Sequence, residues 1–112
     1  MKNNEQFALI TGATSGIGLE LAKIFAKDGY NMVIVARTEN ELRATAQLLE
    51  GKGSPKVIPI ATDLFEPNAA ADLYDMVAAM GIKVDVLVND AGQGAYGKFV
   101  DNDLNDELKI IQ

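Results

Sequence analysis

A glycine-rich segment between a short apolar run and an amphipathic segment constrains the fold of this chain more than any other feature. The apolar run covers residues 7–11 and has the length of a buried strand, and Gly12, Gly16 and Gly18 follow it. The next apolar residues recur at helical spacing before Gly29, and they are Ile17, Leu21, Ile24 and Phe25. This order predicts a strand, a tight turn and a helix.

Three further apolar runs have the composition of strands. Residues 32–36 form a continuous run rich in β-branched side chains, as in a parallel strand that is covered on both faces. Residues 56–62 and 84–88 predict a third and a fourth strand. Pro59 has no backbone N–H to donate, so the third strand should lie at an edge of the sheet.

Two more helices are predicted between these strands. Thr38 and Glu41 have the spacing of a capping box, in which each side chain would bind a backbone amide at the start of the second helix. The third helix should begin near Pro67 and end at Gly81, and its predicted apolar stripe is Leu73, Met76, Val77 and Met80. An amphipathic pattern at residues 103–112 predicts the start of a fourth helix.

Strands that alternate with helices of this length form βαβ units, whose right-handed crossovers put a parallel sheet between two layers of helices. A chain of 112 residues is long enough for one such domain. We therefore expect an α/β fold over residues 1–112, the N-terminal half of a Rossmann-type doubly wound parallel sheet. It should contain about four strands, three helices and the start of a fourth.

Composition excludes several classes of function. The formal net charge is −6 at pH 7 with no basic cluster, so we expect no nucleic-acid partner. The chain has no cysteine and no histidine, which removes thiolate chemistry and the usual zinc ligands, and no metal site is predicted. The polar first residues and the short apolar runs predict neither a signal peptide nor a membrane span. We expect a cytoplasmic protein.

The turn at residues 12–18 is suited to binding a pyrophosphate. It joins a strand to the N-terminus of a helix, where unpaired amides and the helix dipole attract anions. Glycine allows the tight turn and a close approach of the backbone to the ligand. The alternative is a purely structural glycine turn. A triphosphate-binding P-loop is excluded because Leu19 and Glu20, not lysine and a hydroxyl residue, follow Gly18.

Three motifs resemble those of the short-chain dehydrogenase/reductase family. Residues 11–18 match its Thr-Gly-x-x-x-Gly-x-Gly turn, residues 63–64 resemble its adenine-contacting pair, and residues 89–92 resemble its Asn-Asn-Ala-Gly motif, from which Asp90 departs. Each motif follows a predicted strand, where ligands bind in open α/β sheets. Alone, Asp63 or Asn89 would indicate only a loop or turn residue. The resemblance implies that the cofactor is bound by Gly12, Thr14, Ser15, Gly16, Ile17, Gly18, Asp63, Leu64, Asn89, Ala91 and Gly92.

The residues after the second strand indicate which dinucleotide is bound. Family members that prefer NAD have an acid there, which would repel the 2′-phosphate of NADP, whereas this chain has Ala36. Arg37 supplies a forked cation suited to a phosphate, and Thr38 adds a hydroxyl beside it. We therefore predict NADP(H) as the cofactor. The alternative is that Arg37 is solvated or paired with Glu39, which would contribute little energy.

The catalytic residues that the resemblance implies are absent from this sequence. The family uses a tyrosine with a lysine four residues on, and a serine that orients the reacting carbonyl. None of the three tyrosines, which are Tyr30, Tyr74 and Tyr96, has a lysine at that spacing. We predict no catalytic residue here, and we expect an inactive N-terminal piece of a longer protein.

The resemblance implies an NADP(H)-dependent oxidoreductase that transfers hydride to or from a carbonyl or an alcohol. This chain would carry the cofactor-binding half, and the small-molecule substrate would bind mostly outside it. The alternatives are a non-catalytic dinucleotide-binding or regulatory protein and a structural α/β module without a ligand. The fourth strand, residues 84–88, would have a bare apolar edge, so we also expect a homo-oligomer.

Overall fold

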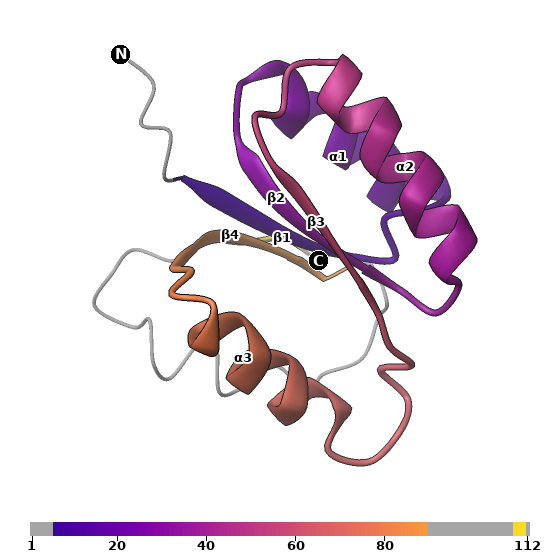
Figure 1. Ribbon diagram of the computed structural model, residues 1–112, viewed down its shortest axis with the longest axis vertical. Helices are drawn as coiled ribbons and strands as arrows, with labels where there is room; N and C mark the ends of the chain where they lie inside the picture. Colours follow the sequence, from indigo (N-terminus) through magenta and orange to yellow (C-terminus); the bar gives the residue numbers. More distant parts are fainter. Residues whose placement is uncertain (1–5, 90–108, 112) are drawn as a thin grey trace.

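One parallel sheet with helices on both faces makes up the described part of the chain, which is residues 6–89 and 109–111 of the computed structural model. In chain order its elements are β1 (Phe7–Thr11), α1 (Gly16–Lys27), β2 (Asn31–Ala36), α2 (Glu39–Gly51), β3 (Val57–Ala61), α3 (Ala69–Ala79), β4 (Val84–Asn89) and β5 (Lys109–Ile111). The strand order is β3-β2-β1-β4-β5, and all neighbouring pairs are parallel. Helices α1 and α2 lie on one face and α3 on the other (Figure 1). The predicted α/β fold is confirmed.

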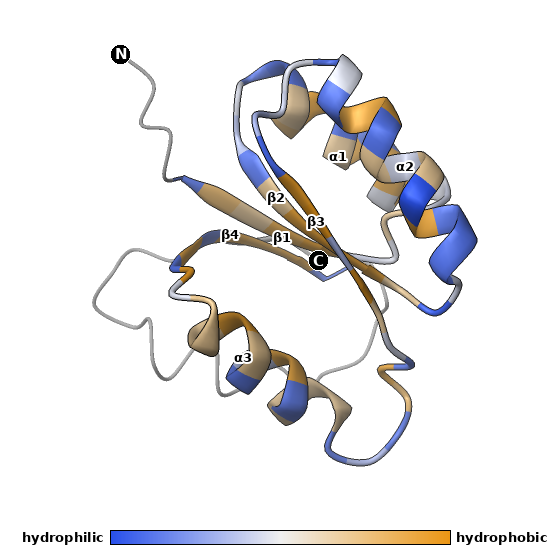
Figure 2. Cartoon of the chain, viewed as in Figure 1, coloured by the Kyte–Doolittle hydropathy of each residue, from blue (hydrophilic) through white to orange (hydrophobic). Residues whose placement is uncertain are grey.

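The second strand separates two apolar cores. Residues 31–35 are all buried, as expected of a strand covered on both faces. Ile34 belongs to the core under α1 and α2, together with Leu42, while Val33 belongs to the core under α3, together with Leu73. Figure 2 shows the apolar residues on the strands and the polar ones on the outer side of α2. The hydrophobic pattern of the sequence therefore determines both layers.

Helix α1 packs on the sheet through small residues. Gly18, Ala22 and Ala26 are buried, whereas Ile17 is 69% and Ile24 is 56% exposed. The predicted apolar stripe is wrong for these two isoleucines. The spacing of four puts the three small residues on one line of the helix, and their short side chains let α1 approach the sheet closely. The large side chains then lie beside the contact.

The starts of the other two helices differ in detail from the prediction. Thr38 is the N-terminal cap of α2, but its side chain makes no capping hydrogen bond, so the predicted capping box is wrong. Glu41 instead lines a cleft described below. Helix α3 begins after Asn68, which has a φ of 68°, so Pro67 precedes the helix instead of lying in its first turn. Gly81 follows the helix with a φ of 75°, as predicted.

The apolar face of α3 is narrower than predicted. Leu73 and Val77 are buried, but Met76 is 44% and Met80 is 47% exposed. The helix contacts the sheet mainly along one line of residues four apart, which leaves both methionines beside that line. Within the described residues, no helix is long and apolar enough to cross a membrane.

Strand β5 corrects two predictions. Residues 109–111 pair in parallel with residues 86–88 of β4, so they form a strand and not part of a helix. The rest of the predicted fourth helix lies outside the described residues. The bare edge predicted for β4 is wrong along residues 86–88, because β5 satisfies the backbone groups there. That basis for self-association is lost, and the homo-oligomer stays a prediction. At the opposite edge lies β3 with Pro59, as predicted.

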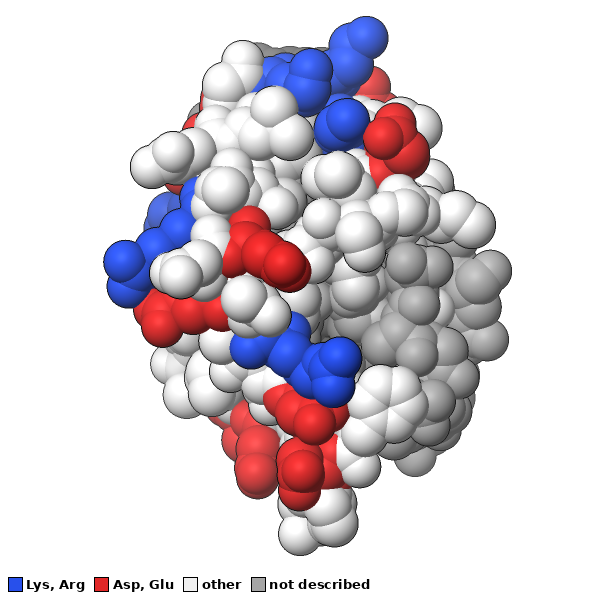
Figure 3. Space-filling view, turned by 90° about the vertical axis from the view of Figure 1, so that its right-hand side faces the viewer, with Lys and Arg blue, Asp and Glu red and all other residues white. Residues whose placement is uncertain are grey.

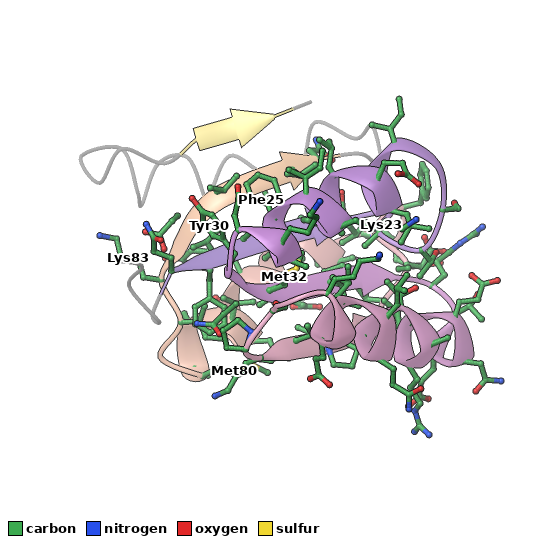
Figure 4. All side chains as sticks on the ribbon, turned by 90° about the horizontal axis from the view of Figure 1, so that it is seen from above. Lys23, Phe25, Tyr30, Met32, Met80 and Lys83 are labelled. Carbon is green, nitrogen blue, oxygen red and sulfur yellow. The ribbon has the colours of Figure 1, made fainter. Side chains whose placement is uncertain are left out.

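The connection from α2 to β3 packs against the end of α1. The Ser54 hydroxyl donates a hydrogen bond to the Tyr30 carbonyl. The rings of Phe25 and Tyr30 meet edge to face, with their centroids 5.1 Å apart, and Figure 4 shows them side by side. Gly53 has a φ of 128°, and a Cβ there would lie 2.8 Å from the Ala26 carbonyl oxygen. These contacts fix how α1 and α2 lie together.

Candidate functional site

A cleft of about 280 Å³ lies where β1, β2 and β3 end, at the carboxyl edge of the sheet. Figure 3 shows this side of the molecule, on which basic and acidic side chains are interspersed with neutral ones. Three connections meet here because parallel strands bring their carboxyl ends to one edge. The cleft is lined by Gly12, Thr14, Ser15, Val35, Ala36, Arg37, Thr38, Glu41, Thr62, Asp63, Leu64 and Phe65.

The glycine turn after β1 forms one wall of the cleft. Gly12 has a φ of 67° and Gly16 a φ of 59°, which is left-handed backbone that residues with a Cβ rarely adopt. The Gly12 amide donates to the Val35 carbonyl over 2.9 Å, so the turn begins in register with β2. Ser15 is the N-terminal cap of α1 and makes no side-chain capping bond, and the first turn of α1 contains no acid. The positive end of this helix dipole is therefore not neutralised by its own first turn.

Arg37 follows β2 and is an exposed residue of the cleft. Glu39 is held by Arg43, whose Nη2 lies 2.8 Å from Glu39 Oε2. Among the described residues, Arg37 itself makes no hydrogen bond or ion pair. The alternative pairing of Arg37 with Glu39 is thus not found, and Arg37, which lines the cleft, has no side-chain partner in the part of the chain described.

The connection after β3 is ordered by Asp63. Its Oδ1 accepts a hydrogen bond from the Phe65 amide over 3.0 Å, and its carbonyl accepts one from the Glu66 amide over 3.0 Å. Leu64 is buried in the core under α3, which anchors the loop. Phe65 is 64% exposed at the cleft. The loop therefore presents an aromatic ring beside a carboxylate that is already engaged by backbone.

Asn89 lies deeper in the molecule than the cleft. It is the last residue of β4 and is only 5% exposed. The Thr11 hydroxyl lies 3.4 Å from Asn89 Oδ1 and 3.4 Å from the Val88 carbonyl oxygen, so it donates to either acceptor. This contact ties the end of β1 to the end of β4.

The structure brings together most, but not all, of the residues predicted for the site. Of these, Gly12, Thr14, Ser15, Arg37, Thr38, Asp63 and Leu64 line the cleft. Gly16, Ile17 and Gly18 form the first turn of α1 and do not line it, and neither does Asn89. Ala91 and Gly92 lie outside the described residues.

Five lining residues were not among the predicted site residues, and they are Val35, Ala36, Glu41, Thr62 and Phe65. Val35 and Ala36 are the last two residues of β2. Glu41 carried the spacing of a capping box, and that interpretation obscured its position four residues after Arg37. Phe65 directly follows the Asp63–Leu64 pair, and this adjacency was the signal that could have identified it. Thr62 continues β3 by donating its amide to the Ala36 carbonyl over 2.9 Å, and nothing in its sequence context marks it.

Comparison with known proteins identifies the family to which the chain is similar. The family model described as short chain dehydrogenase matches residues 6–112. D-beta-hydroxybutyrate dehydrogenase of Rhizobium meliloti is 40% identical over 105 residues, which is 93% of this chain and 41% of that protein. The chain spans between 25% and 47% of the length of eight of the curated relatives it matches.

Solved structures agree with this result. L-sorbose reductase of Gluconobacter frateurii, in complex with NADPH and L-sorbose, is 38% identical with a TM-score of 0.71, over 80% of this chain and 34% of that one. A short-chain dehydrogenase of Sphingobium yanoikuyae, in complex with NADPH, is 34% identical with a TM-score of 0.70, over 79% of this chain and 34% of that one.

Proposed function

Because this chain belongs to the short chain dehydrogenase family, we propose that it is the cofactor-binding half of an oxidoreductase that uses NADP(H) to transfer hydride to or from a carbonyl or an alcohol. The observation that carries this proposal is the cleft at the carboxyl edge, because it joins the glycine turn to Arg37. Ligands bind at this edge in open α/β sheets.

The backbone of the turn fits a bound dinucleotide. A Cβ on Gly16 would meet no atom within 4 Å, so the space in front of this residue is open, and the φ of 59° favours glycine. The cleft of about 280 Å³ is close to the lower end of the roughly 300–1,000 Å³ of ligand pockets. This size is consistent with the adenosine half of the cofactor, with the rest extending along the turn.

The first turn of α1 would hold the pyrophosphate. The amides of Gly16, Ile17 and Gly18 are at the positive end of the α1 dipole, where no acid of the first turn competes for them. Thr14 and Ser15 would add hydroxyl donors from the wall of the cleft. Gly12 would let the turn approach the phosphates closely.

Arg37 and Thr38 would bind the 2′-phosphate. A guanidinium offers two parallel donors to phosphate oxygens, and the Thr38 side chain is not used as a helix cap. Ala36 puts no carboxylate at the end of β2 to repel the phosphate. The NADPH complexes of two structural neighbours support the same choice of cofactor.

The loop after β3 would bind the adenine. Leu64 and Phe65 offer apolar surface at the cleft. Asp63 orders the backbone of this loop by accepting a hydrogen bond from the Phe65 amide. When bound, the reduced cofactor would donate hydride to a carbonyl, and the oxidised cofactor would accept hydride from an alcohol. Asn89, Ala91 and Gly92 are proposed to border the cofactor farther along the sheet, and Thr11 would hold the end of β4 in position through Asn89.

Titration of this chain with NADPH and NADH, followed by nicotinamide fluorescence, tests the proposal. We expect saturable binding of both, with a Kd for NADPH at least about tenfold lower, because Arg37 adds charge-assisted hydrogen bonds. Binding of neither nucleotide would reject the cofactor-binding function. Equal affinities would reject the preference for NADP(H).

A further inference from the structure

Glu41 lines the same cleft as Arg37 and is an exposed residue of the first turn of α2. Its carboxylate makes no hydrogen bond or ion pair with another residue of the described ranges. Glu39, in the same helical turn, differs in both respects, because it is bound by Arg43 and does not line the cleft. The helix therefore places one of its two first-turn glutamates at the wall of the cleft.

The charges of the cleft are not complementary to a phosphate alone. Arg37 is the cation among its lining residues, and the acids are Glu41 and Asp63. Asp63 already accepts a hydrogen bond from the Phe65 amide, so part of its charge is used within the loop. The Glu41 carboxylate has no such described partner. In a cleft of about 280 Å³, a phosphate that binds Arg37 lies within range of the negative field of Glu41.

We propose that Glu41 is a specificity residue that opposes the 2′-phosphate held by Arg37 and so narrows the difference in affinity between NADPH and NADH. This inference rests on the proposed function. The physical basis is that NADPH carries a phosphate at this position, whereas NADH carries a neutral hydroxyl. A carboxylate near that position raises the Kd of NADPH and leaves that of NADH nearly unchanged.

The test compares Glu41→Gln with Glu39→Gln, because both variants remove one negative charge from the same helical turn. The Kd of NADPH and NADH is measured for each variant and for the unchanged chain. For Glu41→Gln we expect the Kd of NADPH to fall roughly three- to fivefold, with that of NADH changing less than about twofold. The gain should shrink as salt is raised from about 0.05 M to 0.5 M, since screening weakens the repulsion. Glu39→Gln should alter the ratio of the two Kd values by less than about 1.5-fold.

The outcomes separate this inference from the proposed function. An unchanged or higher Kd of NADPH in Glu41→Gln would overturn it, and so would an equal change for both nucleotides or an equal effect of Glu39→Gln. In each of these cases the cofactor-binding function itself survives. If the unchanged chain binds neither nucleotide, both proposals fall.

Discussion

The Asp63 carboxylate fixes the backbone of Phe65, with Asp63 Oδ1 accepting a hydrogen bond from the Phe65 amide over 3.0 Å. The side chain that the family resemblance assigns to adenine contact thus also folds the loop that presents the exposed ring. Any effect of this residue on nucleotide binding therefore includes an effect on the position of Phe65.

Two substitutions of Asp63 separate its charge from its role as the hydrogen-bond acceptor that orders the Phe65 loop. Asp63→Ala removes the acceptor and should raise the Kd of NADPH about three- to tenfold, whereas Asp63→Asn keeps an oxygen acceptor and should raise it less than about twofold. Isothermal titration calorimetry measures both values. Asp28→Ala, on an exposed turn away from the cleft, is the control and should have no effect. Equal losses in Asp63→Ala and Asp63→Asn would show that the charge of Asp63, not the turn, matters.

The choice of cofactor should be reversible at the end of β2. Ala36→Asp combined with Arg37→Asp supplies an acceptor for the ribose hydroxyls and repels the 2′-phosphate, so the ratio of the NADH and NADPH affinities should shift roughly 30- to 150-fold toward NADH. Fluorescence titration with both nucleotides gives the ratio. Arg43→Asp makes the same charge change as Arg37→Asp but outside the cleft, where it loses only its pair with Glu39, and it should leave the ratio unchanged. A ratio unaffected by the double variant would contradict the role of Arg37.

Gly53 should not tolerate a side chain. Its φ is 128°, and a Cβ would lie 2.8 Å from the carbonyl oxygen of Ala26. Gly53→Ala must therefore move α1 away from the loop, which we expect to cost about 2–4 kcal/mol of unfolding free energy. Urea denaturation followed by circular dichroism measures this. Gly51→Ala is the matched control, because nothing lies within 4 Å of its Cβ, and it should be neutral or stabilising by up to about 1 kcal/mol. Similar effects at both glycines would contradict the packing described.

Ser54 should contribute to stability through its hydroxyl. It is 4% exposed and donates to the Tyr30 carbonyl, so Ser54→Ala should lower the free energy of unfolding by about 1–3 kcal/mol. Ser15 is exposed and makes no capping bond, so Ser15→Ala should change it by less than about 0.5 kcal/mol. Thermal unfolding of both variants compares them. A larger effect at Ser15 would mean that its hydroxyl does cap α1.

Much of the fold could be predicted because its signals are local. The β-branched run at residues 32–36 and the missing amide of Pro59 depend on nothing distant, and they identified a buried strand and an edge strand. The burial of a helix face depends on how closely the helix approaches the sheet. Hydrophobicity alone favoured Ile17 and Ile24, but small residues such as Ala22 decide that distance. A strand of only three residues at 109–111 has too short a pattern to distinguish from a helix.

In the site, too, the residues with local sequence signals could be predicted, whereas those that depend on the packing of a helix could not. The glycine turn, Arg37 and Asp63 each follow a strand, so the rule that ligands bind at the carboxyl edge of a parallel sheet was enough to group them. Glu41 lies on a helix, and its direction depends on which side of α2 faces the cleft. Because the capping spacing explained this residue in another way, only the three-dimensional arrangement identifies it as part of the site.

Pro59 also affects how separate molecules meet. Thr62 donates its amide to Ala36 of β2, and alternate amides of a strand point the same way, so the backbone nitrogen of residue 59 faces away from the sheet. An incoming strand would meet a ring instead of an N–H in the middle of this five-residue edge. Ile58 and Ile60 flank that position, and such a segment without its proline is prone to intermolecular sheet growth. One pyrrolidine ring therefore removes the N–H that an incoming strand would use at the centre of this edge.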